Sequence, residues 1–461
     1  MTGDPIRWLW AVVAIGLWLA LIGLVKRSLS RARRADLARS AALAPSGDAP
    51  AVLVAFASQT GLAEELAWVT ARCLSDAGTP ARVALLGDLE PAQLKDAGRV
   101  LIVASTTGEG DAPDAMSWFV RQSMKAPTDL AGLSYGLLAL GDRTYADFCG
   151  FGRALDGWLQ RSGAEPLFDR VDVDNGDTGA VRHWQHQLGL LTGSTVQPDW
   201  TPPAFDDWQL VQRTHLNPGS PGGEAWLMGF EPVGHTPVWV AGDIAEIGLP
   251  ALDGQPAPGS REYSVASLPA DGRAAFIVRL MHRPDGRPGL ASGWLTHGLA
   301  LGDKVGMRIR TNRSFHGPTA ETPLILIGNG TGLAGLRAHW KARAGQASGQ
   351  TWLMFGERTR AHDAFLDAEL QSALGSGLLT RLDRVFSRDT GSEGQGGRYV
   401  QALITEHAAE LAAWVDRGAA ILVCGSLEGM SKGVHEALEK ALGIGALQSL
   451  TDAGRYRRDV Y

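Results

Sequence analysis

The chain has 461 residues, of which 45% are hydrophobic and 20% are charged, and its formal net charge is −6 at pH 7. This length predicts two or three domains, because a single hydrophobic core stops growing well below it. The acidic balance argues against a nucleic-acid-binding protein, which needs a basic excess to neutralise phosphates. The three cysteines, Cys73, Cys149 and Cys424, form no CxxC pair. They therefore offer neither a disulfide framework nor a zinc site, and they indicate a reducing compartment.

The first feature along the chain is an uncharged apolar run at residues 8–25, about as long as a helix needs to cross a bilayer. Six basic residues follow it within residues 26–39, whereas only Arg7 precedes it. Because positive charge stays on the cytoplasmic side, we expect a single-pass anchor in the inner or cytoplasmic membrane, with the catalytic domains in the cytoplasm. A cleaved signal peptide is the alternative, but the basic cluster lies on the wrong side for one. Residues 26–50 form an expected basic tether.

Residues 51–191 alternate apolar runs with helix-length segments. This alternation predicts an open, mostly parallel sheet with helices on both faces, and we place its strands at residues 51–57, 81–86, 99–104, 135–140 and 167–173. Three of these strands end in loops rich in glycine and hydroxyl groups: Ser58-Gln59-Thr60-Gly61, Ser105-Thr106-Thr107-Gly108, and Gly141-Asp142 with Tyr145 and Phe148 beyond. Ligands bind outside the carboxyl ends of parallel strands, so the three loops should converge on one crevice. The first loop opens a helix, whose N-terminus can bind an anion without a basic residue.

Residues 192–205 resemble a linker, and the character of the sequence changes after them. Short alternating runs with frequent glycine and proline over residues 206–319 predict a small antiparallel barrel. An expected strand of this barrel carries Arg261-Glu262-Tyr263-Ser264, and a short helix is expected to begin at Gly289-Leu290-Ala291-Ser292. An arginine and a helix start built from small residues can both bind a pyrophosphate.

From residue 320 to residue 461 the strand–helix alternation returns, with expected strands at residues 323–327, 351–355, 379–386 and 419–424. The first of them runs into Gly328-Asn329-Gly330-Thr331-Gly332. A glycine-rich turn between a strand and a helix lets the pyrophosphate of a dinucleotide approach the backbone. Polar and basic residues follow the next two strands: Arg358, Ser387, Arg388, Arg398, Tyr399 and Gln401.

In this order, the motifs from residue 51 to residue 461 resemble the diflavin reductases, most closely the sulfite reductase flavoprotein and cytochrome P450 reductase group. The resemblance implies a flavodoxin-like FMN domain at 51–191, a ferredoxin–NADP reductase-like FAD-binding barrel at 206–319 and an NADP-binding domain at 320–461. FMN would bind to the three loops of the first domain. The FAD positions would be Arg261, Tyr263, Ser264, Gly289, Ala291 and Ser292. The NADPH positions would be Gly330, Thr331, Arg358, Ser387, Arg388, Arg398, Tyr399 and Gln401.

The resemblance also implies a preferred nucleotide and a set of catalytic residues. Ser387, Arg388 and Tyr399 match the positions that hold the 2′-phosphate, so NADPH is expected rather than NADH. Tyr461 would cover the FAD ring until the nicotinamide moves it aside. The remaining three catalytic positions would orient the hydride donor and manage charge and proton at flavin N5: Ser264, Cys424 and Asp459. A carboxylate there would stabilise the cation that develops on the nicotinamide. No metal is expected.

The chain departs from the family pattern at several positions. Thr107 stands where many relatives have an aromatic residue that stacks on FMN, so Tyr145 or Phe148 must supply the stacking. Residues 251–260 join two barrel strands where larger relatives insert a helical connecting domain, which makes this chain a compact version. Other family residues are replaced by Asn329, by Gly335-Leu336, by Ser426 and, in place of an arginine that helps to hold FAD, by His316.

We therefore expect an NADPH-dependent oxidoreductase that passes electrons from NADPH through FAD and FMN to a separate one-electron acceptor, such as a haem, iron or iron–sulfur protein. Residues 51–191 contain 18 Asp and Glu against 11 Lys and Arg. An acidic rim around the exposed flavin edge would favour a partner with a basic docking face. Two alternatives stay open, a membrane-associated ferric-siderophore reductase and a flavin-based redox sensor or scaffold with weak turnover.

Overall fold

The computed structural model describes residues 51–143, 145–193, 204–235, 237–251, 259–283, 285–345, 349–389, 397–426 and 430–460. The expected membrane anchor at residues 8–25, the tether at 26–50, most of the linker and Tyr461 lie outside these ranges. Within them, none of the helices combines the length and the apolar character that a membrane crossing requires.

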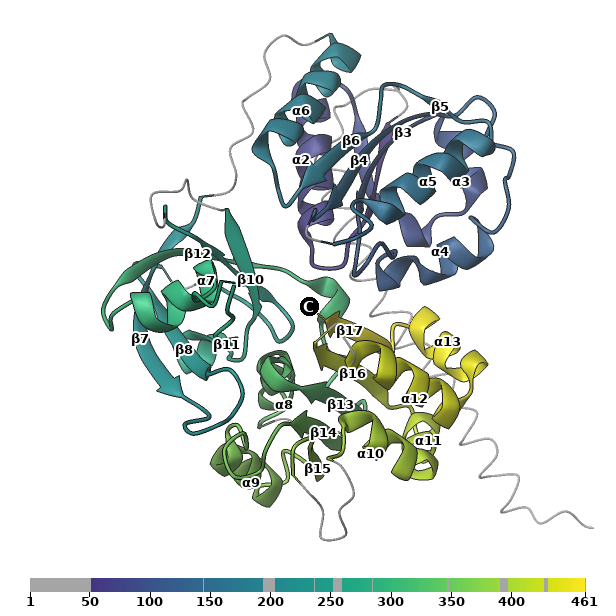
Figure 1. Cartoon of the computed structure of the whole chain (residues 1–461). Coiled ribbons are helices and arrows are strands. Elements are labelled where there is room, and N and C mark those ends of the chain that lie inside the picture. The colour runs from purple at the N-terminus through teal and green to yellow at the C-terminus, as the bar shows by residue number, and fades with distance from the viewer. Residues whose placement is uncertain are drawn as a thin grey trace, which may run out of the picture.

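The first unit is a parallel sheet with helices on both faces, as the sequence predicts (Figure 1). Its strands are β1 (Val52–Ala57), β2 (Ala81–Leu85), β3 (Arg99–Ser105), β4 (Ser134–Gly141), β5 (Glu165–Pro166) and β6 (Val171–Asp174). They lie in the order β2-β1-β3-β4-β5, with β6 also paired to β4. The helices are α2 (Leu62–Asp76), α3 (Pro91–Ala97), α4 (Ser117–Gln122), α5 (Gly150–Arg161) and α6 (Thr178–Thr192). The single strand expected at 167–173 is wrong in detail, because the chain pairs with β4 in two short pieces.

Side-chain alternation along β3 explains the two helical layers of this unit. Val100 and Ile102 point into the core beneath α3, α4 and α5, whereas Leu101 and Val103 point into the core beneath α2 and α6. A strand that is apolar on both faces must be covered on both, which is the usual state of a parallel strand. The carboxyl ends of β1, β3 and β4 consequently meet at one edge of the sheet.

The second unit is an antiparallel sheet of six strands in the order β10-β9-β12-β7-β8-β11. The strands are β7 (Asp206–His215), β8 (Ala225–Pro232), β9 (Ile244–Gly248), β10 (Ser260–Ser264), β11 (Ala274–Arg279) and β12 (Lys304–Arg310), and the short helix α7 covers Leu290–Gly293. Just after β10, the Ala266 N–H donates to the Ala275 carbonyl of β11 over 2.6 Å. The two edges of the sheet therefore approach each other, and the sheet curls into the expected barrel around Trp208, Phe230 and Phe276.

The third unit is a parallel sheet in the order β15-β14-β13-β16-β17. Its strands are β13 (Leu324–Asn329), β14 (Thr351–Glu357), β15 (Arg381–Phe386), β16 (Ala420–Gly425) and β17 (Tyr456–Val460). Its helices are α8 (Leu333–Lys341), α9 (Asp367–Gly375), α10 (Val400–Glu406), α11 (Ala408–Asp416), α12 (Lys432–Leu442) and α13 (Ile444–Asp452). The four expected strands are confirmed, and β17 adds a fifth, which sequence periodicity did not show because three of its five residues are Arg or Asp.

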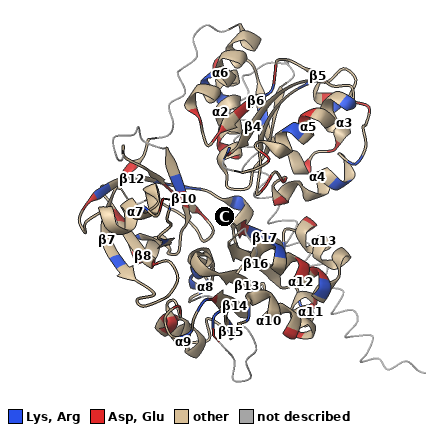
Figure 2. Ribbon diagram, in the orientation of Figure 1, with Lys and Arg blue, Asp and Glu red and all other residues tan. Residues whose placement is uncertain are grey.

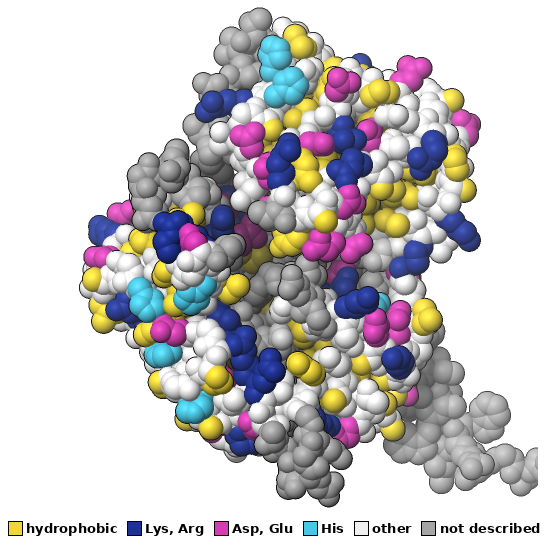
Figure 3. Space-filling model, in the orientation of Figure 1, with side chains coloured by type: hydrophobic (Ala, Val, Ile, Leu, Met, Phe, Trp, Pro, Cys, Tyr) yellow, Lys and Arg dark blue, Asp and Glu magenta, His cyan; other side chains and the backbone are white. Residues whose placement is uncertain are grey.

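The three units are joined in different ways. One hydrophobic core runs continuously from the barrel, through Leu227 and Ile277, into α8 and β13 of the third unit. The first unit shares no such cluster with the others among the described residues, and it meets them through polar and charged side chains instead. The charges at this junction can be followed in Figure 2, and the space-filling view is hollowed along it (Figure 3). Polar junctions of this kind permit relative motion of domains more readily than hydrophobic ones.

Candidate functional site

The three glycine- and hydroxyl-rich loops of the first unit converge at the carboxyl edge of its sheet, as expected. The second loop is bound to the end of β4 by a hydrogen bond from the Thr106 N–H to the Leu140 carbonyl, 2.9 Å long. The second and third loops are joined where the Ala146 N–H donates to Glu109 Oε2 over 3.2 Å. Gly110 lies so close to Asp147 that an added Cβ would stand 2.5 Å from the carboxylate, and its φ of +140° also favours glycine.

These loops line a cavity of about 810 Å³ that the first unit shares with the barrel and with Val460 of β17. Thr106 Oγ1 and Thr107 Oγ1 are buried and have no hydrogen-bond partner in the described structure. Buried hydroxyls without a partner are costly, so a ligand with polar atoms would satisfy them. The size of the cavity, its position beyond the strand ends and these two hydroxyls fit the ribityl and ring portions of FMN.

The two aromatic residues expected to stack on the FMN ring, Tyr145 and Phe148, both line this cavity. The guanidinium of Arg143 lies 4.5 Å from the centre of the Phe148 ring and covers one of its faces. Tyr145 is 39% exposed, and its side chain is therefore accessible at the cavity. Both residues therefore stay candidates for stacking on the ring.

A second polar cluster lies where β10, β16 and β17 approach one another. The Ser264 hydroxyl donates to Asp459 Oδ2 over 2.6 Å, and the Cys424 thiol donates to the same oxygen over 3.7 Å. All three side chains are buried. An added Cβ on Gly335 of α8 would stand 2.9 Å from the Cys424 sulfur, so this departure from the family pattern brings the helix backbone close to the cluster. The structure therefore brings together three of the four expected catalytic residues.

Burial is the main reason why both titratable groups of this cluster have raised pKa values. The pKa of Asp459 rises to about 6, because burial and then the neighbouring Glu262 carboxylate oppose its charge, although the Ser264 hydroxyl favours it. Burial and the Asp459 charge raise the pKa of Cys424 well above its usual value. The thiol is therefore neutral near pH 7, and Asp459 loses its proton at a slightly acidic pH.

The raised pKa of Asp459 predicts that Asp459→Asn stabilises the protein at alkaline pH. A carboxyl whose pKa is higher in the folded state than in the unfolded state contributes fully to the free energy of unfolding below its unfolded pKa. This contribution is lost as the pH rises through the folded pKa of about 6. We therefore expect the variant to exceed the parent in unfolding free energy by on the order of 2 kcal/mol at pH 8, with the difference vanishing near pH 4. Thermal unfolding followed across this pH range checks the prediction. A variant that melts below the parent at pH 8 would contradict it.

The expected FAD residues are divided between two faces of β10. Arg261 and Tyr263 lie on the face opposite Ser260, Glu262 and Ser264, because strand side chains alternate. The Tyr263 ring stacks on Phe276 with 5.1 Å between centroids, and Arg261 is exposed and donates to the Ser260 carbonyl. On α7, Ser292 Oγ accepts from the Met281 N–H over 3.1 Å. These FAD assignments stay predictions, and only Ser264 among them lies in the polar cluster with Cys424 and Asp459.

The expected NADPH residues gather at the carboxyl ends of β14 and β15. The Ser387 N–H donates to the Glu357 carbonyl and the Arg388 N–H donates to the Arg358 carbonyl, both over 2.7 Å. Gly397 packs against the Ser387 carbonyl, so the chain that leads to Tyr399 and Gln401 passes the same strand end. Arg398 is exposed and is paired with Glu406. Gly330 and Thr331 form the turn between β13 and α8, as expected.

Two of the departures from the family pattern contact each other. Asn329 Oδ1 accepts from the Ser426 N–H over 3.1 Å, so the residues that replace Pro and Asp join the ends of β13 and β16. His316 does not line the large cavity, and its Nε2 lies 2.6 Å from Asp243 Oδ1 instead. The compact connection is visible in the register, where Ser260 of β10 pairs with Gly248 of β9 as neighbours in the sheet.

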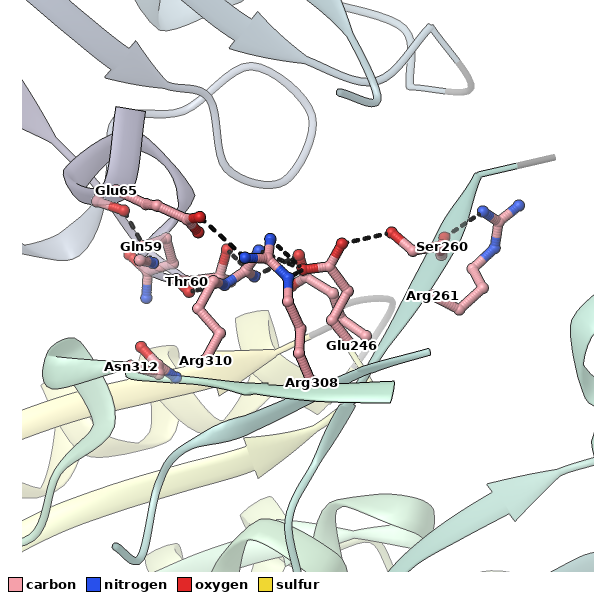
Figure 4. Close-up of polar contacts among 12 residues, drawn as sticks. Gln59, Thr60, Glu65, Glu246, Ser260, Arg261, Arg308, Arg310 and Asn312 are labelled. Atoms are coloured by element: carbon pink, nitrogen blue, oxygen red, sulfur yellow. Dashed lines mark hydrogen bonds and ion pairs between the residues drawn. The ribbon is translucent and has the colours of Figure 1, made fainter. Parts of the chain in front are cut away.

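Sequence reasoning missed the charged residues that join the first unit to the other two. Arg308 of β12 reaches Glu65 just after the first loop, and Arg310 reaches Thr60 within it (Figure 4). Arg458, next to Asp459 of the buried polar cluster, pairs with Asp114, which follows the second loop. Arg308 and Arg310 alternate along the last strand of the barrel in the sequence, which indicates a basic face. Nothing in the sequence indicates which unit this face would meet. Glu65 and Asp114 of the first unit therefore have their ion-pair partners within the same chain.

A family model described as Flavodoxin matches residues 54–184, and one described as Oxidoreductase NAD-binding domain matches residues 326–436. Similar proteins include three named Sulfite reductase [NADPH] flavoprotein alpha-component. That of Vibrio vulnificus is 27% identical over 88% of this chain and 87% of its own length. That of Vibrio parahaemolyticus is 29% identical over 92% and 89%, and that of Neisseria meningitidis is 28% identical over 96% and 95%. These alignments span 544 to 578 positions, more than the 461 residues of this chain, so the relatives contain additional internal segments.

Proposed function

We propose that this chain, a member of the diflavin reductase family, takes reducing equivalents from NADPH and passes them through FAD and FMN to a separate acceptor. The flavodoxin and NAD-binding matches lie on either side of the barrel, in the order that this electron path requires. The relatives are named as alpha-components, which supports an acceptor on another chain. These comparisons do not favour a ferric-siderophore reductase or a redox sensor.

One observation carries this proposal. The cavity of about 810 Å³ is lined at once by the three loops of the first unit, by barrel residues and by Val460, whose neighbour Asp459 belongs to the catalytic cluster. A ligand bound at the loops would therefore face the barrel rather than open solvent. Electron transfer between two flavins requires their binding sites to face each other in this way. Two sites for unrelated ligands would not need to lie together.

The residues of the catalytic cluster orient the reaction and control its charge. When bound, NADPH and the two flavins would supply the hydride and the electron carriers, and this chemistry belongs to them. Asp459, ionised above about pH 6, places a carboxylate where positive charge develops on a nicotinamide. The Ser264 hydroxyl fixes the orientation of that carboxylate through their 2.6 Å hydrogen bond. Burial of all three side chains excludes water from the site.

Flavin extraction from the purified full chain tests this proposal directly. We expect FMN and FAD in equal amounts, and NADPH should reduce cytochrome c, a one-electron acceptor, far faster than NADH does. Protein with intact structure that binds only one flavin, or that oxidises NADPH negligibly at saturating concentration, would contradict the assignment.

We also propose a membrane anchor and an acceptor with a basic docking face. The apolar run at residues 8–25, followed by six basic residues within 26–39, supports a membrane anchor that keeps the catalytic units on the cytoplasmic side. The full chain should then sediment with membranes, and a chain lacking residues 1–47 should not; equal partitioning of the two would contradict the anchor.

The excess of acidic residues in the first unit supports an acceptor with a basic docking face. Since Glu65 and Asp114 pair with Arg308 of the barrel and Arg458 of the third unit, such an acceptor would compete with both of these units for the acids.

A further inference from the structure

The first unit offers the expected phosphate of its first loop hydroxyls and the N-terminus of α2 (Leu62–Asp76), but none of its described Lys or Arg residues lines the large cavity. The loop offers two hydroxyls, from Ser58 and Thr60, and Leu62 begins the helix that follows. The first turn of that helix carries Glu64 and Glu65, and Ser58 Oγ already accepts from the Gly61 N–H over 2.9 Å. Among the residues of this unit that line the cavity, none is Lys or Arg. A phosphate monoester carries a charge close to −2 at neutral pH, of which the N-terminus of a helix offsets only about half a unit charge, so a cation beside the loop would strengthen the site.

The barrel provides the missing cations from β12. Arg310 donates from Nε to the Thr60 carbonyl over 3.0 Å and from Nη2 to Thr60 Oγ1 over 3.3 Å. Arg308 donates from Nη1 to Glu65 Oε1 over 2.8 Å, beside the start of α2 (Figure 4). Both arginines line the cavity, and Arg310 is only 7% exposed. A guanidinium already bonded to the phosphate loop is suitably placed to bind a phosphate on that loop.

The backbone on both sides fixes this contact. An added Cβ on Gly61 would stand 2.3 Å from the Thr311 carbonyl, which immediately follows β12, so only glycine permits the two units to approach so closely. Gly61 also has a φ of +91°, which other residues rarely adopt. The same residue therefore forms the turn of the phosphate loop and admits the strand that carries Arg310.

The carboxylates near Arg310 show how it can accept a second anion. Glu246 is buried and is held by Arg308, by Arg310 and by the Ser260 hydroxyl, so it is a fixed part of the cluster. Glu262 also pairs with Arg310, but its side chain is 38% exposed. An exposed carboxylate loses little when it returns to water, whereas a buried one loses much. A phosphate at Thr60 would therefore take the place of Glu262 on Arg310 and leave Glu246 where it is.

We propose that Arg310 of the barrel is a ligand of the FMN phosphate, so that the FMN site of the first unit is completed by the second. This inference rests on the proposed function, because it assumes that the first loop binds FMN. Arg310 and the phosphate loop belong to different units. FMN binding and docking of the two units therefore stabilise each other by the same free energy. The phosphate then acts as a link between the units as well as an anchor for the flavin.

The test is the affinity of the full chain for FMN, measured by flavin fluorescence after FMN has been removed selectively. Arg310→Gln should raise the dissociation constant at least about tenfold, since it deletes a hydrogen bond between two charged groups. Glu262→Gln should lower it, because it removes the competing anion. Arg121→Gln is the matched control, because Arg121 also pairs across the units, with Asp452 at 2.9 Å, but does not line the cavity. It should leave the dissociation constant within about twofold of the parent.

FAD content, measured in the same samples, shows whether each variant is folded. An unchanged FMN affinity in Arg310→Gln, with FAD retained, would overturn the inference and leave the diflavin assignment intact. Failure of the parent to bind any FMN would overturn both. As a second readout, small-angle scattering should show that FMN compacts the FMN-depleted parent but not Arg310→Gln; equal compaction of the two would contradict the link between the units.

Discussion

Replacing Asp459 by Asn should slow the reduction of FAD by NADPH by about a hundredfold or more, while both flavins remain bound. The carboxylate is buried and accepts from Ser264 at 2.6 Å, so it is held in a fixed position with its charge undiluted by water. An amide keeps the shape and can still accept from the hydroxyl, but it cannot stabilise a developing cation. Rapid mixing of the oxidised protein with NADPH, followed by flavin absorbance, measures the step directly.

The matched control for this variant is Asp416→Asn, because Asp416 is an exposed carboxylate at the end of α11, away from the cluster. Its rate should equal that of the parent. The pH dependence gives a second check, since the parent should lose activity as pH falls below about 6, where Asp459 becomes protonated, and Asp459→Asn should not show this loss. A variant that reduces FAD at the parental rate would remove Asp459 from the mechanism.

The second large effect is expected at the nucleotide site. Arg388→Ala should raise the KM for NADPH by about ten- to a hundredfold, since a charged hydrogen bond to the 2′-phosphate is lost. NADH lacks that phosphate, so its KM should hardly change. Arg388 is exposed at the end of β15, where its N–H donates to the Arg358 carbonyl, and the side chain is free to meet a ligand from solvent.

Steady-state kinetics with both nucleotides separate this role from a structural one. Arg182→Ala, at an exposed position on α6 of the first unit, is the control and should leave both KM values unchanged. An equal rise for NADPH and NADH in Arg388→Ala would show that the residue does not read the 2′-phosphate.

The parts of this fold that could be predicted from sequence are those governed by local pattern. Strands such as β3 and β16 are continuous apolar runs, and the glycine-rich turns that follow β1, β3 and β13 have the residue types that a close backbone approach requires. Convergence of the three loops followed from the rule that parallel strands present their carboxyl ends at one edge. The grouping of Ser264, Cys424 and Asp459 came from family resemblance, and no local pattern would have indicated it, because they lie on strands far apart in the sequence.

What could not be predicted are the contacts between units. β17 was missed because its polar residues point in opposite directions, with Arg458 toward Asp114 and Asp459 toward Ser264. Arg308 and Arg310 alternate along β12 as solvated residues of an amphipathic strand would, but the first unit covers them. The acidic composition of the first unit indicated an external basic partner, whereas Glu65 and Asp114 have partners within the chain. Composition gives the sign of a charged face but not what covers it.

The central claim is that electrons leave through FMN after entering at FAD. The most direct measurement mixes NADPH with the full chain, with and without its FMN, and follows flavin absorbance and cytochrome c reduction together. We predict that FAD is reduced at the same rate in both samples and that cytochrome c is reduced rapidly only when FMN is present. Rapid reduction of cytochrome c by the FMN-depleted protein would contradict the account.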